Sequence, residues 1–124
     1  MRFLGSFKHK ELVEIYKKAD LFLFLSYYEG FPTVVLEAMS SGLPVLVSDI
    51  EAHKNFLIDF ENGVLIKKGS ADDASQKISL VLNNPDLKNK LGKNARKTVE
   101  QKFTWNKISE KFERKYLKII NGDL

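Results

Sequence analysis

Two short apolar runs with a helix-forming segment between them constrain the fold of this chain most strongly. The runs are Leu21–Leu25 and Pro44–Val47, which have the length and continuous apolar character of buried parallel strands. The segment Pro32–Ser41 predicts a helix, because proline has its φ already set for a first helical position and Gly42 suits the helix end. The sequence therefore predicts a strand, a helix and a second strand in succession.

The same alternation of strand and helix continues along the whole chain. We expect further strands at Arg2–Leu4 and Gly63–Ile66, and helices at His9–Lys18, Lys54–Ile58, Ala71–Leu82, Pro85 or Asp86 to Gln101, and from the N-cap Thr104 to Ile120. Such a pattern is typical of α/β proteins. The predicted fold is a Rossmann-like parallel sheet of about four strands flanked by helices, with residues 1–124 in a single domain.

Two glutamates surround the turn before the helix at Pro32–Ser41. Glu29 precedes a Gly-x-Pro turn in which Gly30 permits a positive φ, and Glu37 lies about five residues into the helix, about 7.5 Å from its start. A helix N-terminus has unpaired N–H groups that suit a phosphate, whereas the two acids suit neutral hydroxyls. The segment therefore favours a sugar nucleotide, with its ribose at one acid and its sugar at the other. A solvated helix face is the alternative.

At this point the residues resemble a known family. The run Ala19–Asp49 resembles the signature of the retaining glycosyltransferases of family 4, also called glycosyl transferases group 1, which have the two-domain GT-B fold. Glu29 and Glu37 match the Glu-x7-Glu donor motif of that family. Asn62–Ile66 is similar to the strand after the donor loop, and Phe103–Trp105 is similar to the start of the last helix. The order of these motifs agrees with the family as well as each motif does.

The resemblance extends from Arg2 to about Ile120, with one departure. The segment Asp49–Asn55 has no Gly-Gly, and Asn55 stands where many members of the family carry a glutamate. A chain of 124 residues forms one core and little more, whereas a complete GT-B enzyme has two domains. The resemblance therefore implies a partial C-terminal GT-B domain, and we expect a fragment, a split-gene product or an engineered piece.

The resemblance also implies a reaction and a set of site residues. The reaction is the transfer of a sugar from a nucleotide-diphosphate sugar to an acceptor, with retention and without a metal or cofactor. Glu29 is the expected catalytic residue through contact with the donor sugar, but not as a nucleophile, because nothing places a second carboxylate about 5–5.5 Å away. Glu37 is expected to bind the ribose, and the N–H groups of Phe31 and Thr33 to face the diphosphate or sugar. The expected substrate-binding residues are Glu29, Gly30, Phe31, Pro32, Thr33 and Glu37.

Three hypotheses about function remain at this stage. The first is the donor-binding half of a glycosyltransferase, whose partner is the missing N-terminal domain or another chain. The second is a non-catalytic nucleotide-sugar-binding or interaction module. The third is an unrelated Rossmann-like or response-regulator-like domain, which is disfavoured because the sequence has no Gly-x-Gly-x-x-Gly, no P-loop and no cluster of acids in a phospho-acceptor arrangement.

The residue types present limit the chemistry. The chain has no cysteine, which excludes disulfides and thiolate metal sites. His9 is expected at a helix start and His53 in a loop near the donor site, and they form no ligand-spaced cluster, so we expect no metal. There is no apolar run of signal-peptide length at the N-terminus, and we expect a cytoplasmic location.

The formal net charge of +4 is unevenly distributed. Lysines and arginines greatly outnumber acidic residues between Lys88 and Lys118. This is typical of a solvated outer helix face. The alternative is a peripheral contact with an anionic membrane or a lipid-linked acceptor. The aromatic residues of this segment are spaced like a packing stripe and not like a base-stacking platform, so we expect no nucleic-acid partner.

The resemblance implies an open sheet edge. In the family order 3-2-1-4-5-6, Arg2–Leu4 corresponds to the third strand and Leu21–Leu25 to the fourth, and the two strands between them are missing. Leu21–Leu25 would then lack a neighbour. The terminal helix would also be partly uncovered, because the resemblance implies that it packs toward the absent domain. We expect either a homo-oligomer that exchanges strands or helices, or a rearrangement that brings Arg2–Leu4 beside Leu21–Leu25.

Overall fold

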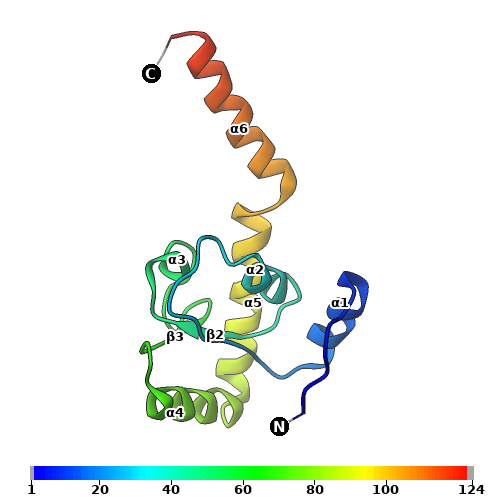
Figure 1. Ribbon diagram of the computed structural model, residues 1–124, viewed down its shortest axis with the longest axis vertical. Helices are drawn as coiled ribbons and strands as arrows, with labels where there is room; N and C mark the ends of the chain where they lie inside the picture. Colours follow the sequence, from blue (N-terminus) through cyan, green and yellow to red (C-terminus); the bar gives the residue numbers. More distant parts are fainter. Residues whose placement is uncertain (1, 123–124) are drawn as a thin grey trace.

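A parallel sheet of three strands with helices on both faces forms the body of the protein (Figure 1). The structure is a computed structural model that describes residues 2–122. Its strands lie in the order β1-β2-β3. The elements are α1 (His9–Lys18), β1 (Phe22–Phe24), α2 (Thr33–Ser40), β2 (Val45–Ser48), α3 (Glu51–Lys54), β3 (Val64–Ile66), α4 (Ala71–Leu82), α5 (Pro85–Lys102) and α6 (Trp105–Ile120).

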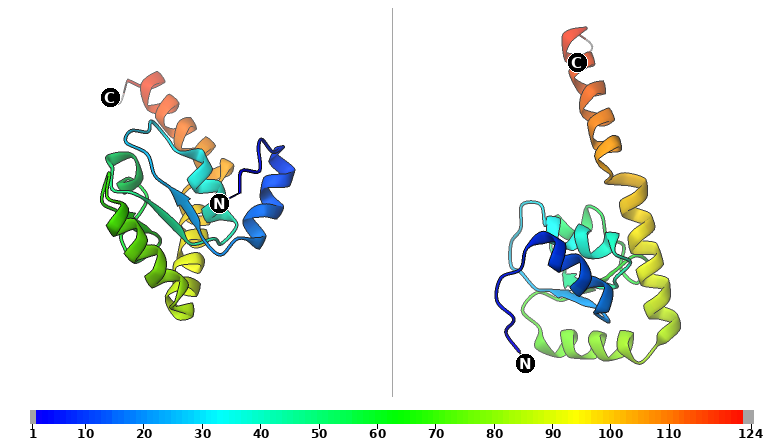
Figure 2. Two further views of the ribbon diagram at one scale, coloured as in Figure 1. Left: turned by 60° about the horizontal axis from the view of Figure 1, so that its bottom comes forward. Right: turned by 90° about the vertical axis from the view of Figure 1, so that its right-hand side faces the viewer.

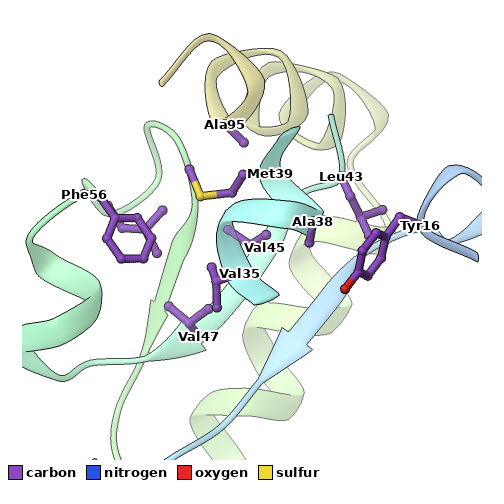
Figure 3. Close-up of a cluster of buried hydrophobic side chains, with 10 residues drawn as sticks. Tyr16, Val35, Ala38, Met39, Leu43, Val45, Val47, Phe56 and Ala95 are labelled. Carbon is purple, nitrogen blue, oxygen red and sulfur yellow. The ribbon is translucent and has the colours of Figure 1, made fainter. Parts of the chain in front are cut away.

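The alternation of side chains along β2 divides the core into two clusters. Val45 and Val47 face α2, where Val35, Ala38 and Met39 cover them (Figure 3). Leu46 faces the other way, into a cluster with residues of β3, α4 and α5. All six side chains are fully buried. Successive side chains of β2 point to opposite faces of the sheet, and both faces are buried. The sequence of β2 is therefore apolar at consecutive positions.

The sheet face toward α4 is covered unevenly. Leu23 of β1 pairs in register with Leu46 of β2. Leu46 is fully buried under α4 and α5, whereas Leu23 is 41% exposed. Within residues 2–122, β1 pairs with β2 alone, so its other edge is open, as expected. An open edge next to an exposed apolar residue is a surface that another segment of protein can cover.

Side-chain caps define the long helices where the sequence predicts them. Ser70 accepts a hydrogen bond from the N–H of Asp73, and Thr104 accepts one from the N–H of Lys107. Asn84 caps α5 in the same way, with Pro85 in the first turn. Each cap satisfies an N–H group that has no partner inside the helix. The predicted boundaries of α4 and the N-cap of α6 are therefore confirmed.

Two glycines allow α2 and α5 to approach each other closely. Gly42 ends α2 with a φ of +76°, a conformation that other residues rarely adopt. Gly92 lies in α5 directly against the carbonyl oxygen of Gly42, where a Cβ atom would collide with the backbone. The contact between these helices therefore depends on the missing side chain at Gly92.

A buried asparagine holds together the segment between α3 and β3. The Asn62 side-chain amide donates to the carbonyl oxygen of Phe56 at 3.0 Å and to Oγ1 of Thr98 at 2.9 Å. Its side-chain oxygen accepts from the N–H of Ile58 at 2.7 Å. Asn62 is thus fully hydrogen-bonded in the core and ties this irregular segment to α5.

Helix α6 extends away from the body of the protein (Figure 1), and the right-hand view of Figure 2 shows the same separation. None of its residues is buried, and Trp105 is 85% exposed. One side of the helix is apolar through Ile108, Phe112 and Tyr116. No helix within residues 2–122 is both long and apolar enough to cross a membrane.

Two predicted elements are wrong. Arg2–Leu4 forms no strand, and Phe3 is 86% exposed. The described sheet therefore has three strands and not about four, and the expected rearrangement beside β1 does not occur. A strand needs a neighbour for its backbone groups, and this segment has none. The short helix expected at Lys54–Ile58 lies earlier, at Glu51–Lys54, because it begins directly after the turn that follows β2.

Candidate functional site

Two hydrogen bonds fix the carboxyl edge of the sheet, where the predicted site residues begin. The N–H of Ser26, just after β1, donates to Oγ of Ser48 at the end of β2 at 2.9 Å. The N–H of Asp49 donates to the carbonyl oxygen of Ile66 at the end of β3 at 2.7 Å. The loop that carries Glu29 therefore leaves the sheet from a point held to the neighbouring strand. This edge is where open α/β sheets bind ligands.

The turn before α2 is tighter than the sequence predicts. The N–H of Thr33 donates to the carbonyl oxygen of Phe31 at 2.9 Å, across Pro32 with φ −80° and ψ 80°. This geometry is an inverse γ-turn. The helix therefore begins at Thr33, with Pro32 as its N-cap and not its first helical residue. The expectation that the Thr33 N–H faces a ligand is wrong, because that group is already bonded. Gly30 does not have the expected positive φ.

Aromatic contacts hold this turn against the body. The ring of Phe31 lies 6.4 Å from that of Phe56 and 6.3 Å from that of Phe103, measured between centroids. The rings of Phe56 and Phe103 are 6.0 Å apart in an edge-to-face arrangement. Phe56 is buried after α3, and Phe103 ends α5. Three distant parts of the sequence thus meet beneath the predicted site.

Both predicted acids are half-buried and available to a ligand. Within residues 2–122, neither the Glu29 nor the Glu37 carboxylate makes a hydrogen bond or an ion pair. Burial, and secondly the negative charge of Glu37, raise the pKa of Tyr16 above its usual value. This places the Glu37 carboxylate on the side of α2 that faces α1. A half-buried carboxylate without a partner readily accepts hydrogen bonds from hydroxyl groups.

The remaining predicted residues surround these acids. Gly30, Phe31 and Thr33 are exposed, and Pro32 is buried beneath the turn. The predicted residues therefore belong to one segment, which runs from the loop after β1 into α2. No acidic residue occupies the first turn of α2, so the partial positive charge of the helix N-terminus is not neutralised from within the helix.

His53 differs from its predicted place. It lies in α3 and is fully buried, not in a loop open to ligand. Its Nδ1 lies 2.7 Å from the carbonyl oxygen of Ser48, and because a carbonyl only accepts, Nδ1 carries the proton. The rings of Phe24 and Phe56 meet it edge-on. His53 therefore holds the turn after β2 in place and does not reach the surface.

Sequence reasoning missed two serines at this edge. Ser26, which is half-buried, comes two residues after β1, and Ser48, which is buried, is the last residue of β2. Their position at the end of an apolar run is the signal that could have identified them, because the carboxyl ends of parallel strands meet at one edge.

Comparison with known proteins shows the family of this chain. The profile of the family described as Glycosyl transferases group 1 matches residues 1–98. The chain belongs to this family. Among curated relatives, it is 34% identical over 122 residues to N,N'-diacetylbacillosaminyl-diphospho-undecaprenol alpha-1,3-N-acetylgalactosaminyltransferase of Campylobacter jejuni, covering 98% of this chain and 32% of that protein. The chain thus spans about a third of the length of this relative.

Solved structures of glycosyltransferases share the fold. A mutant of TarM from Staphylococcus aureus, in complex with Fondaparinux, alpha-GlcNAc-glycerol and UDP, matches with a TM-score of 0.76 and 31% identity, over 82% of this chain and 21% of that one. The C-terminal domain of the glycosyl transferase group 1 protein LpcC from Francisella tularensis matches with a TM-score of 0.71 and 25% identity, over 85% of this chain and 53% of that one. The predicted parallel α/β fold is confirmed.

Proposed function

We propose that this group 1 glycosyltransferase chain forms the donor-binding part of a retaining family 4 enzyme that uses a nucleotide-diphosphate sugar. The observation that carries the proposal is the pair of unpartnered carboxylates, Glu29 and Glu37, beside the N-terminus of α2 at the carboxyl edge of the sheet within residues 2–122. The presence of UDP in the TarM complex supports a nucleotide donor. The likeness to the LpcC domain supports a place in the C-terminal half of the whole enzyme.

In this proposal Glu37, Glu29 and Phe31 have defined roles. Glu37 accepts hydrogen bonds from the ribose, and Glu29 contacts hydroxyls of the donor sugar. The N–H of Phe31 and the partial positive charge of α2 face the diphosphate, and stabilise its charge as it leaves. The bond between the anomeric carbon and the diphosphate oxygen breaks, a bond to the acceptor oxygen forms, and the proton of the acceptor hydroxyl leaves with the diphosphate.

The proposed partner is an N-terminal domain that supplies the rest of the enzyme. Helix α6 supports this, because its apolar side has no cover within residues 2–122. Self-association through α6 or the open edge of β1 is the alternative partner. The basic side of α6, with Lys111, Arg114 and Lys118, is compatible with peripheral contact to an anionic membrane surface in the cytoplasm or to a lipid-linked acceptor.

Replacing Glu37 with alanine is expected to weaken binding of UDP to this chain. The change removes hydrogen bonds to a charged acceptor, so the loss should be about 1.5–3 kcal/mol of binding free energy. Glu29→Ala should weaken binding of UDP-glucose but leave that of UDP nearly unchanged, because only the sugar meets Glu29. Isothermal titration calorimetry with both ligands measures these differences.

Glu113→Ala on α6 is the matched control, since Glu113 is exposed and remote in sequence from the turn. It should bind both ligands as the wild type does. Equal affinity of the wild type and Glu37→Ala for UDP would remove the ribose assignment.

The isolated chain is expected to transfer no sugar. Much of the rate of a transfer comes from holding donor and acceptor together, and this chain lacks most of the length of its relatives. A radiolabelled-donor assay should give only background, and activity should return when the N-terminal domain of a relative is added in trans. UDP binding without activity under any complementation would instead favour the non-catalytic nucleotide-sugar-binding module.

A further inference from the structure

The loop between β1 and α2 has few backbone bonds to the body of the protein. Within residues 2–122, no backbone N–H group from residue 27 to residue 31 donates a hydrogen bond. On one side of this stretch the Ser26 N–H bonds to Oγ of Ser48, and on the other the Thr33 N–H bonds to the carbonyl oxygen of Phe31. The second bond lies within the turn itself. Side-chain packing, and not backbone hydrogen bonding, therefore determines the position of this turn.

Two aromatic rings hold the side chain of Phe31. The ring of Phe31 is tilted by 58° to that of Phe56 and by 48° to that of Phe103, at centroid separations within the range where aromatic pairs attract each other. Phe56 is 4% exposed and belongs to the core cluster below α2, whereas Phe103 is half-buried and packs against the outside of that cluster. Of the two rings, Phe103 is therefore the one whose position depends on structure outside the core.

Phe103 lies at the junction of α5 and α6. Its N–H donates to the carbonyl oxygen of Val99 at 2.8 Å, which completes the end of α5. Thr104 follows directly and caps α6, and the helix leaves the body of the protein from this point (Figure 1). The Phe103–Trp105 motif of the sequence thus lies next to the turn that carries Glu29. A change in the angle between α5 and α6 acts on the residue that contacts Phe31.

We propose that Phe103 is a positioning residue for the nucleotide-sugar donor. Through the ring of Phe31 it holds the turn before α2 so that the Phe31 N–H faces the diphosphate, and it does not touch the donor itself. The proposal rests on the proposed function, which assigns that N–H to the diphosphate. Because coupling between two sites is reciprocal, donor binding at the turn also restrains the junction of α5 and α6. One pair of rings thus links the donor site to the helix proposed to contact the N-terminal domain.

Titration of the ¹⁵N-labelled chain with UDP tests this role. Phe103→Leu keeps an apolar side chain but removes the ring, and it should weaken UDP binding about fivefold. Phe31→Leu should cause a similar loss. The double variant should bind UDP little more weakly than either single variant, because both changes remove the same contact. Independent effects would instead multiply to about 25-fold, and that result would overturn the inference.

Val99→Ala is the matched control. Val99 lies one turn before Phe103 on α5 and packs against the same core cluster, but it takes no part in the aromatic contacts of Phe31. This variant should lower the stability through lost apolar burial and still bind UDP as the wild type does. A purely structural role for Phe103 predicts the same behaviour for Phe103→Leu. Circular dichroism shows that each variant is folded at the temperature of the titration.

The amide signals of the junction give a second readout that does not require a change at Phe103. UDP should shift the signals of Phe103 and Thr104 in the wild type but not in Phe31→Leu, whose altered side chain is 56% exposed in the wild type and lies outside the core. If UDP binds without these shifts, or binds Phe103→Leu as tightly as the wild type, the inference is overturned and the proposed function stands. If the wild type does not respond to UDP, the proposed function is overturned, and the donor role of Phe103 with it.

Discussion

Replacing Asn62 with alanine should lower the free energy of unfolding by about 3 kcal/mol. The side chain makes three hydrogen bonds, to Phe56, Ile58 and Thr98, and each contributes about 1 kcal/mol net. Alanine cannot replace them, and the backbone groups left behind stay partly or fully buried. Urea denaturation followed by circular dichroism measures the difference through the shift in midpoint at constant slope.

Asn94→Ala is the matched control for this change. Asn94 lies on α5 and makes one exposed side-chain bond, from its amide to the carbonyl oxygen of Glu61 at 2.8 Å. Its replacement should cost about 1 kcal/mol or less, because water can take over the freed carbonyl. If Asn62→Ala and Asn94→Ala lowered the free energy of unfolding by similar amounts, the hydrogen bonds of Asn62 would not determine the stability of this segment.

Gly92→Ala should destabilise the protein although it places a better helix former in α5. Helix propensity alone would add about 1 kcal/mol of stability. The new Cβ, however, meets the carbonyl oxygen of Gly42, which is backbone and cannot rotate away. Separating α2 from α5 disturbs well-packed side chains, and such overpacking costs about 1–3 kcal/mol or more. We expect a net loss of about 2 kcal/mol in thermal or urea denaturation.

The two contributions to the stability of Gly92→Ala have opposite signs, so a measured gain or loss shows which one is larger. Lys93→Ala, at the next and exposed position of the same helix, should change the stability by less than about 0.5 kcal/mol. If Gly92→Ala were more stable than the wild type, helix propensity would outweigh the contact, and the close approach of α2 and α5 would not need a glycine.

The long helices could be predicted from the sequence because their signals are local. Ser70 and Thr104 each cap a helix through the N–H three residues later, and Gly42 ends α2 with a positive φ. A few neighbouring residues determine these features. The strands β1 and β2 were predictable for a different reason, since both have a continuous apolar sequence; only β2 is buried on both faces.

Elements that depend on distant partners were not predictable. Arg2–Leu4 has an apolar strand-like sequence but no neighbouring strand, so it stays outside the sheet and exposed. At the site, the acids Glu29 and Glu37 were identifiable from their spacing. The γ-turn at Pro32 was not, although its hydrogen bond is local, because a proline suits the first helical position as well as a turn. The burial of His53 was not, because it depends on packing against Phe24 and Phe56.

The aromatic contacts beneath the turn have a thermal consequence. Phe31 is held against Phe56 and Phe103 by apolar surface, whereas the ion pair between Lys54 and Asp49 nearby depends on charge. Apolar association weakens on cooling and is little affected by ionic strength at moderate salt, whereas exposed ion pairs are screened. The order of the turn that carries Glu29 therefore falls in the cold. Moderate salt should therefore disturb the ion pair of Lys54 and Asp49 more than the aromatic contacts that hold the turn.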